Sequence, residues 1–332
     1  MTVNGERILV TGAAGMIGSA LARELVKQGA TVTIADNLSR GSLDNIKDIL
    51  KDVRFMKLDL TECKNAEMAV KNQDRVVMLA ARLGGIKEIL DVPADVAHQN
   101  MLIDINTIRA AKNAGVRHVT FASSACSYGP SCDVPAREDD PKMGLDFDSI
   151  YGRSKFYSEH LIRAYGEQYG IRSTILRFFN VHSEHEPLSL ASHVIPCLCH
   201  KAMVLKQDPF EVWGSGGQTR SFLHTDDVVR GILLAMEKAP DGTPINLGTP
   251  EKIKIRDLAH KILEYSGHTP KEVIFDTKMP EGVHDRCANN DRARELLGWQ
   301  PTMTFDEGLR KTVEGFKRKV DRDGQGVTAS EG

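Results

Sequence analysis

Two short segments of the 332-residue sequence carry side chains whose types and spacing suit proton transfer. The first, SSACSY, contains Ser124 and Cys126 directly after an apolar run. The second, YGRSK, contains Tyr151 and Lys155 at a spacing of four, which puts them on one face of a helix. A tyrosine with its reference pKa of about 10 is a poor base, and we expect the neighbouring ammonium to lower that pKa. The thiol, with a reference pKa of about 8.5, suits an acid or base role directly.

The segment VTGAAGMIG predicts a dinucleotide site. Gly12, Gly15 and Gly18 lie between an expected strand and an expected helix, where glycines let the backbone approach a pyrophosphate at the helix N-terminus. Asp36, at the end of the second expected strand, can accept hydrogen bonds from both ribose hydroxyls and would repel a 2′-phosphate. It therefore favours NAD over NADP, although the guanidinium of Arg40 could receive such a phosphate. The further cofactor contacts that we predict are Met16, Ile17, Asn37, Asp59, Leu60, Ala80 and Ala81, with Tyr151 and Lys155 at the reacting end.

The elements that must position these side chains alternate along the first 180 residues. Segments rich in β-branched residues are followed by helical patterns, which predicts parallel strands joined by helical crossovers. We therefore expect an α/β fold with a Rossmann-type, doubly wound parallel sheet. The expected strands cover residues 7–11, 31–36, 54–59, 75–80, 118–123 and 172–178, and the expected helices cover residues 16–28, 62–71, 98–113 and 150–169.

After about residue 180 the pattern changes to short strands, a few helices and loops that contain Gly and Pro. We expect residues 1–179 to form the NAD-binding domain, including the Ser, Tyr and Lys described above. Residues 180–318 should form mainly a smaller α/β domain for the substrate, with some segments that return to the first domain. The polar, Gly-containing tail 319–332 is expected to be disordered.

The composition excludes several classes of protein. With 41% hydrophobic residues, 27% charged residues and a formal net charge of −2, the chain has no global attraction for nucleic acid or for an anionic membrane. No apolar run reaches the roughly 20 residues that span a bilayer, and no signal-peptide pattern precedes the first expected strand. The six cysteines resemble reduced thiols, and neither Cys197 with Cys199 nor His182 with His185 has the further ligands that a metal site needs. We expect a cytoplasmic protein without a metal.

Together these segments resemble the extended short-chain dehydrogenase/reductases that modify nucleotide sugars. The resemblance covers about residues 6–316 and rests on TGAAGMIG, DNLSRGSLDN, SSACSY, YGRSK, RFFNV, GGQTRSFLHTDDVV and RARELLGWQP. It implies that Tyr151 takes a proton from a sugar hydroxyl as hydride passes to NAD, that Ser124 hydrogen-bonds the same oxygen, and that Lys155 also holds the nicotinamide ribose. It further implies a homodimer through a four-helix bundle built from the helices 98–113 and 150–169.

Cys126 narrows the resemblance, because simple 4-epimerases of this family do not require it. Two branches that do have such a cysteine, the GDP-mannose 3,5-epimerases and the GDP-L-fucose synthases, resemble the chain at specific points. The segment LGGI resembles both branches; SSAC, VWGSGGQTRSF and PEGVHDR resemble the epimerases, whereas SHVIP, with His193 as the acid residue, resembles the synthases. The resemblance implies that Arg220 contacts the sugar and diphosphate and that Arg286 lies near the diphosphate. The substrate contacts that it implies are Gly84, Gly85, Ser124, Asn180, His193, Arg220 and Arg286.

Inversion of a carbon next to a ketone is a reaction in which a thiol can serve as acid or base. Once C4 of a sugar is a ketone, the protons on C3 and C5 can be abstracted, and inversion needs a base on one face and an acid on the other. Cys126 and His193 suit these roles in either order. We therefore predict an NAD-dependent nucleotide-sugar epimerase resembling GDP-mannose 3,5-epimerase, with a GDP-sugar favoured as substrate and C3, C5 or both inverted.

Three alternatives stay open. In a UDP-hexose 4-epimerase, Cys126 and His193 would be spectators, and in a GDP-L-fucose synthase-like epimerase/reductase the chain would consume NADPH. A cofactor-sensing protein without activity would typically lack the tyrosine or the lysine. The loop 180–187, NVHSEHEP, departs from the family pattern N-x-Y-G-P and indicates a changed sugar or nucleotide.

Overall fold

The computed structural model describes residues 3–328, and its main element is a seven-stranded sheet. The strand order is β11-β6-β5-β4-β1-β2-β3, and every neighbouring pair is parallel. This confirms the predicted doubly wound α/β class. The strands are β1 (Arg7–Thr11), β2 (Thr31–Asp36), β3 (Val53–Lys57), β4 (Arg75–Met78), β5 (His118–Ser124), β6 (Arg172–Phe178) and β11 (Asp241–Leu247).

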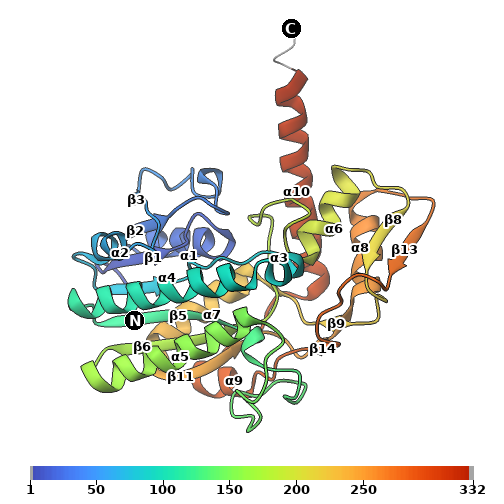
Figure 1. Ribbon diagram of the computed structural model, residues 1–332. Helices are drawn as coiled ribbons and strands as arrows, with labels where there is room; N and C mark the ends of the chain where they lie inside the picture. The colour runs from blue at the N-terminus through green and yellow to red at the C-terminus, as the bar shows by residue number, and fades with distance from the viewer. Residues whose placement is uncertain (1–2, 329–332) are drawn as a thin grey trace.

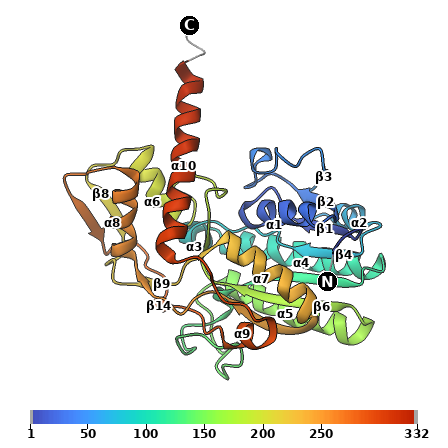
Figure 2. The ribbon, with the colours of Figure 1, turned by 180° about the vertical axis from the view of Figure 1, so that it is seen from behind.

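Helices cover both faces of this sheet. On one face lie α1 (Met16–Lys27) and α7 (Thr225–Lys238), and on the other lie α2 (Cys63–Val70), α4 (Pro93–Asn113) and α5 (Ile150–Tyr169), as Figures 1 and 2 show from opposite sides. Side chains alternate along a strand. Ile8 and Val10 of β1 therefore pack into the core on the side of α1 and α7, and Leu9 packs into the core on the side of α2, α4 and α5. A strand covered on both faces must be apolar throughout, which is why the β-branched runs were readable in the sequence.

The predicted bounds differ from the observed ones mainly at helix and strand ends. β4 ends at Met78 rather than at residue 80, and β3 is shifted to Val53–Lys57. α4 begins at Pro93 rather than at residue 98, because proline is well tolerated in the first turn of a helix, where its missing N–H has no partner to lose.

A separate apolar core lies beside the large sheet. It is formed by apolar side chains of α6 (Val194–Met203), α8 (Ile255–Ser266), α10 (Phe305–Thr328) and β8 (Phe210–Trp213), which lie together on one side of the molecule (Figure 1). The segments α7 and β11 return to the large sheet, and the boundary at residue 179 stays a prediction. The remaining elements are η1 (Leu43–Asn45), α3 (Ile86–Asp91), η2 (Ala125–Ser127), β7 (Val181–His182), β9 (Thr219–Arg220), β10 (Leu223–His224), β12 (Ile253–Lys254), β13 (Val273–Asp276), β14 (Asp285–Arg286) and α9 (Asp291–Leu297).

α10 projects from the body of the molecule and continues to Thr328, across a stretch for which the sequence predicts disorder from residue 319 (Figure 2). Two contacts give a physical reason for order beyond Arg318. Lys319 donates to the carbonyl oxygen of Glu184, and the guanidinium of Arg322 lies 3.5 Å from the carboxylate of Asp44. The last part of the predicted tail, 329–332, lies outside the described residues. Among residues 3–328, no helix combines the length and the hydropathy needed to traverse a bilayer.

Candidate active site

A cleft of about 1630 Å³ opens at the carboxyl ends of β4, β5 and β6 and is bounded on its other side by α3, α6 and the segment 280–287. Parallel strands end at one edge of the sheet, so side chains that follow different strands meet there. All of the predicted catalytic residues line this cleft: Ser124, Cys126, Tyr151, Lys155 and His193. The predicted substrate contacts Gly84, Gly85, Asn180, Arg220 and Arg286 line it as well.

The glycine turn between β1 and α1 leaves no room for side chains. Gly12 has a φ of +67°, and a Cβ at this position would lie 2.8 Å from Cα of Ala80. A Cβ on Gly18 would lie 2.5 Å from Cα of Ala13. Gly15 caps α1 without a side-chain hydrogen bond, so the first N–H groups of the helix stay available to an anion. The turn therefore fits the pyrophosphate of the predicted dinucleotide.

Asp36 lies beside this turn and is buried. Its carboxylate accepts hydrogen bonds from the backbone N–H of Ala14 at 2.9 Å and of Leu38 at 2.8 Å, and burial nevertheless raises its pKa. The guanidinium of Arg40 is engaged elsewhere, 3.6 Å from the carboxylate of Glu88 on α3. This pairing weakens Arg40 as a receptor for a 2′-phosphate and favours NAD. Of the other predicted cofactor contacts, Met16, Ile17 and Ala81 line the cleft, Asn37 hydrogen-bonds Asp59, and Leu60 and Ala80 follow β3 and β4.

Tyr151 and Lys155 are both buried on the first turns of α5, and Tyr151 hydrogen-bonds Ser124. The expected lowering of the tyrosine pKa by the lysine is wrong for this structure. Burial raises the pKa of Tyr151, and Cys126 and Asp104 raise it further. The carboxyl of Asp104, on α4, lies 3.6 Å from Nζ of Lys155, and burial raises the pKa of this carboxyl as well.

Asp104 was missed in the sequence. It is 2% exposed and also accepts a 2.8 Å hydrogen bond from the hydroxyl of Ser158. A carboxylate in the middle of an otherwise apolar helix pattern is a weak signal, because only the packing of α4 against α5 reveals its partner.

Cys126 lies in η2, at the end of β5, and its backbone N–H donates to Oγ of Ser124 at 3.1 Å. Gly152 lets η2 pack directly against α5, since a Cβ on Gly152 would lie 1.9 Å from the carbonyl oxygen of Cys126. Nη1 of Arg286 lies 3.4 Å from the thiol sulfur, and Nη2 lies 2.9 Å from the carboxylate of Asp148. Burial alone would lower the pKa of Arg286, but Cys126 and Asp148 raise it. Arg286, expected near a diphosphate, is thus in contact with the thiol.

His193 is the N-cap residue of α6 and lies on the opposite side of the cleft. Oε1 of Glu186 is 2.6 Å from its Nδ1 and accepts its backbone N–H at 3.1 Å. Burial alone would lower the pKa of His193, but the charge and hydrogen bond of Glu186 raise it. Glu186 was also missed, although it lies in the loop whose sequence departs from the family pattern.

The remaining predicted contacts hold the backbone around the cleft. Arg220 donates to the carbonyl oxygens of Thr219 at 2.8 Å, Val283 at 2.7 Å and Glu281 at 3.0 Å, and burial lowers its pKa to about 10. The side-chain amide of Asn180 donates to the carbonyl of Ser221 at 2.8 Å.

Gly85 approaches Ser192 so closely that a Cβ would lie 2.6 Å from the serine carbonyl oxygen. Gly84 lies close to the pair formed by Arg40 and Glu88, since a Cβ on Gly84 would lie 2.0 Å from Oε2 of Glu88 and 3.1 Å from Nη1 of Arg40.

Nothing in the described residues groups three or more metal-ligating side chains. His182 and His185, three positions apart in the departing loop, have separate partners: His182 contacts Thr312 of α10 at 3.0 Å, and His185 contacts Asn45 at 3.3 Å.

Comparison with known proteins gives consistent results along nearly the whole chain. The model of the NAD dependent epimerase/dehydratase family matches residues 8–248. The chain is 32% identical over 323 residues to a GDP-mannose 3,5-epimerase of Arabidopsis thaliana, covering 96% of this chain and 84% of that protein. It is 29% identical over 326 residues to a GDP-L-fucose synthase of Sinorhizobium fredii, covering 96% and 98%. Among solved structures, the epimerase Mth375 of Methanothermobacter thermautotrophicus is similar with a TM-score of 0.89 at 28% identity, over 96% of this chain and 94% of that one.

Proposed function

Because this chain belongs to the NAD dependent epimerase/dehydratase family of enzymes, we propose that it is an NAD-dependent nucleotide-sugar epimerase of the GDP-mannose 3,5-epimerase type. One observation carries the choice of type: a thiol and an imidazole, those of Cys126 and His193, line the same cleft as Tyr151 and Ser124. A 4-epimerase has no use for either group. The similarity to the plant GDP-mannose 3,5-epimerase supports a GDP-sugar as substrate.

The glycine turn and Asp36 would hold NAD. Gly12 and Gly15 leave the N-terminus of α1 open to the pyrophosphate, and the Asp36 carboxylate is positioned for the ribose. When bound, NAD supplies the hydride acceptor, and later the donor, for C4 of the sugar.

At C4, Tyr151 takes the proton of the sugar hydroxyl and Ser124 hydrogen-bonds the same oxygen. Since burial raises the pKa of Tyr151, its phenolate forms only when positive charge is brought close to it. Proton abstraction at C4 is therefore expected only in the complex with cofactor.

At the carbon next to the ketone, the surroundings of the two groups favour one order of events. The guanidinium of Arg286 lies 3.4 Å from Sγ of Cys126, and on this contact we assign the role of the base to Cys126. The carboxylate of Glu186 beside Nδ1 favours an imidazolium, so His193 acts as the acid. Cys126 removes the C–H proton and the electron pair moves into the enolate, whose oxygen Ser124 and Tyr151 hold. His193 then gives its proton to the same carbon from the opposite face.

Solvent exchange tests this proposal. GDP-mannose incubated with the enzyme and NAD in heavy water should acquire deuterium at C3, at C5 or at both, as measured by proton NMR of the sugar. The position of the label assigns the inverted carbon. Inversion at C4 without any label, with GDP-mannose or with UDP-glucose run in parallel, would replace the proposal with a 4-epimerase.

A second candidate, an epimerase/reductase similar to GDP-L-fucose synthase, is favoured by His193 in the segment SHVIP and by the similarity to that enzyme. It would oxidise one NADPH for each product formed, whereas the 3,5-epimerase leaves the cofactor unchanged at the end of each turnover. The engagement of Arg40 by Glu88 argues against NADPH. Absorbance of the reduced nicotinamide during turnover distinguishes the two.

The proposal includes a homodimer through α4 and α5. Both helices carry large exposed apolar side chains, with Met101 41%, Ile105 38%, Tyr157 56% and Tyr169 47% exposed. Apolar surface gathered on neighbouring helices is typical of an association surface. The proposal also includes a cytoplasmic location, and the near-zero net charge gives no global attraction for nucleic acid or for an anionic membrane.

A further inference from the structure

We propose that Glu186 is the positioning residue of this site: its carboxylate holds the His193 ring by Nδ1 and leaves Nε2 to deliver the proton to the sugar. The inference rests on the proposed function, in which His193 is the acid. It also gives a role to the departing loop 180–187, whose sequence alone indicated a changed sugar or nucleotide.

The geometry orients the ring. Oε1 of Glu186 accepts from both Nδ1, at 2.6 Å, and the backbone N–H, at 3.1 Å, of His193. Two bonds to one oxygen fix the ring relative to the backbone of His193, at the N-cap of α6. A carboxylate at Nδ1 requires a proton on that nitrogen, so Nε2 is the atom left for the substrate. Within residues 3–328, Nε2 of His193 has no hydrogen-bond partner.

The carboxylate of Glu186 makes its hydrogen bonds to this histidine. Glu186 is 5% exposed, and both hydrogen bonds that its side chain accepts among the described residues come from His193, while its other oxygen, Oε2, is buried without a partner. Burial would raise the pKa of Glu186, but His193 and Arg40 lower it, so the carboxylate stays ionised. The other charges that act on His193 are those of Arg40 and Glu88, which oppose each other and pair at 3.6 Å. Glu186 therefore decides the protonation of His193.

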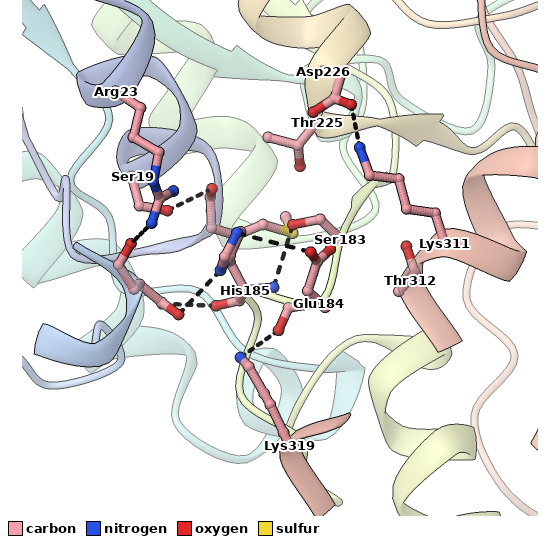
Figure 3. Close-up of polar contacts among 12 residues, drawn as sticks. Ser19, Arg23, Ser183, Glu184, His185, Thr225, Asp226, Lys311, Thr312 and Lys319 are labelled. Atoms are coloured by element: carbon pink, nitrogen blue, oxygen red, sulfur yellow. Dashed lines mark hydrogen bonds and ion pairs between the residues drawn. The ribbon is translucent and has the colours of Figure 1, made fainter. Parts of the chain in front are cut away.

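The loop that carries Glu186 is anchored by the two residues that precede Glu186. The carbonyl oxygen of Glu184 accepts from Lys319, and the backbone carbonyl of His185 accepts from the side-chain amide of Asn45 at 2.9 Å. Figure 3 shows Glu184 and His185 among side chains of α1 and α10, including Arg23 and Lys319. Glu184 thus offers a matched control, since it lies in the same loop and its carboxylate does not contact His193.

The first test follows the histidine itself. The Cε1 proton of His193 is titrated by NMR in the full-length protein and is assigned among the 11 histidines by its loss in His193→Gln. In the wild type it should titrate above the reference pKa of about 6.5. Glu186→Gln keeps the size of the side chain and removes its charge, and should lower that midpoint by about one unit or more. Glu184→Gln should leave it unchanged.

The second test follows the reaction. Because the acid must be protonated, the basic limb of the pH profile for deuterium incorporation should move to lower pH in Glu186→Gln, with at least about tenfold slower exchange at pH 8. Glu186→Asp, which keeps the charge, should restore part of the exchange and covers the case in which the glutamine variant fails to fold.

An unchanged titration of His193 in a folded Glu186→Gln protein would overturn the inference, even if the wild type is a 3,5-epimerase. A shifted titration with an unmoved basic limb would also overturn it, since the contact would then be only structural. A wild type that incorporates no deuterium would instead overturn the proposed function, so the two failures are distinguishable.

Discussion

The two sides of the cleft are assembled in different ways. On the α5 side, Tyr151 and Lys155 come from consecutive turns of one helix and are 4% and 2% exposed. On the opposite side, the side chain of His193 is 44% exposed and depends on a loop glutamate. Cys126, between the two, meets Arg286 from 160 positions further along the chain.

This difference separates the effect of burial, which acts mainly on stability, from the effect of ion pairing, which acts mainly on protonation. The α5 side is preformed, and removing either member of its buried Lys155–Asp104 pair would leave the other member without a partner in the interior. The His193 side is tuned by ion pairs that set protonation with less influence on folding. Changes on the first side should therefore abolish the whole reaction or unfold the protein, and changes on the second should alter one step.

The largest expected effect is that of Tyr151→Phe. Without the hydroxyl there is no base for C4, so both epimerisation and deuterium exchange should fall by about 10²–10⁴-fold or more. Product and label are measured together by proton NMR. Exchange that survives the loss of epimerisation would show that the thiol acts without prior oxidation, and the division of labour between the two sides would be wrong.

Cys126→Ser should affect only the second step. A serine hydroxyl is a far weaker base than a thiolate, so deuterium exchange at C3 and C5 should fall by about 10²-fold or more, whereas oxidation at C4 continues. The two steps are followed by NMR and by absorbance of the reduced cofactor. Cys63→Ser, in α2 and away from the cleft, is the control. Wild-type exchange in the Cys126 variant would remove the thiol from the mechanism.

The free energy of unfolding should also differ between variants of the two sides. Asp104→Asn leaves the buried Lys155 without its counter-charge and should lower the free energy of unfolding by about 3–5 kcal/mol. His193→Gln, which changes a half-exposed residue, should lower it by about 1 kcal/mol or less. Urea unfolding of both variants measures this directly. Equal effects would mean that the two sides are not built differently.

The smallest effect on the chemistry is expected at the surface of α4. Ile105→Glu introduces a charge into the exposed apolar face and should convert a dimer to a monomer, with little change in the rate of epimerisation. Light scattering after size-exclusion chromatography reports the halved molar mass. Leu145→Glu, at a side chain 75% exposed outside these helices, is the control. A wild-type monomer would end the dimer proposal.

The sequence predicted β1, β2, β6 and α5 to their end residues, because apolar runs of β-branched residues and a four-residue spacing are local signals. It also singled out residues that line one cleft, since the ends of parallel strands must meet. It did not predict Asp104, Glu186 or the contact of Arg286 with the thiol. Each depends on which side chain faces another after packing, and nothing in the local pattern around these residues carries that information. The direction of the Tyr151 pKa was also missed, because its largest cause is the burial of the tyrosine, which depends on packing.

The close approach of Gly152 to the carbonyl of Cys126 has a consequence for protein engineering. The turn that carries the thiol packs directly against the helix backbone that carries the tyrosine. Neither segment can therefore be moved, lengthened or transferred to another scaffold without changing the position of the other. Libraries that aim to change the chemistry of this enzyme should therefore keep residues 124–126 and 151–155 as one cassette and vary the loop opposite.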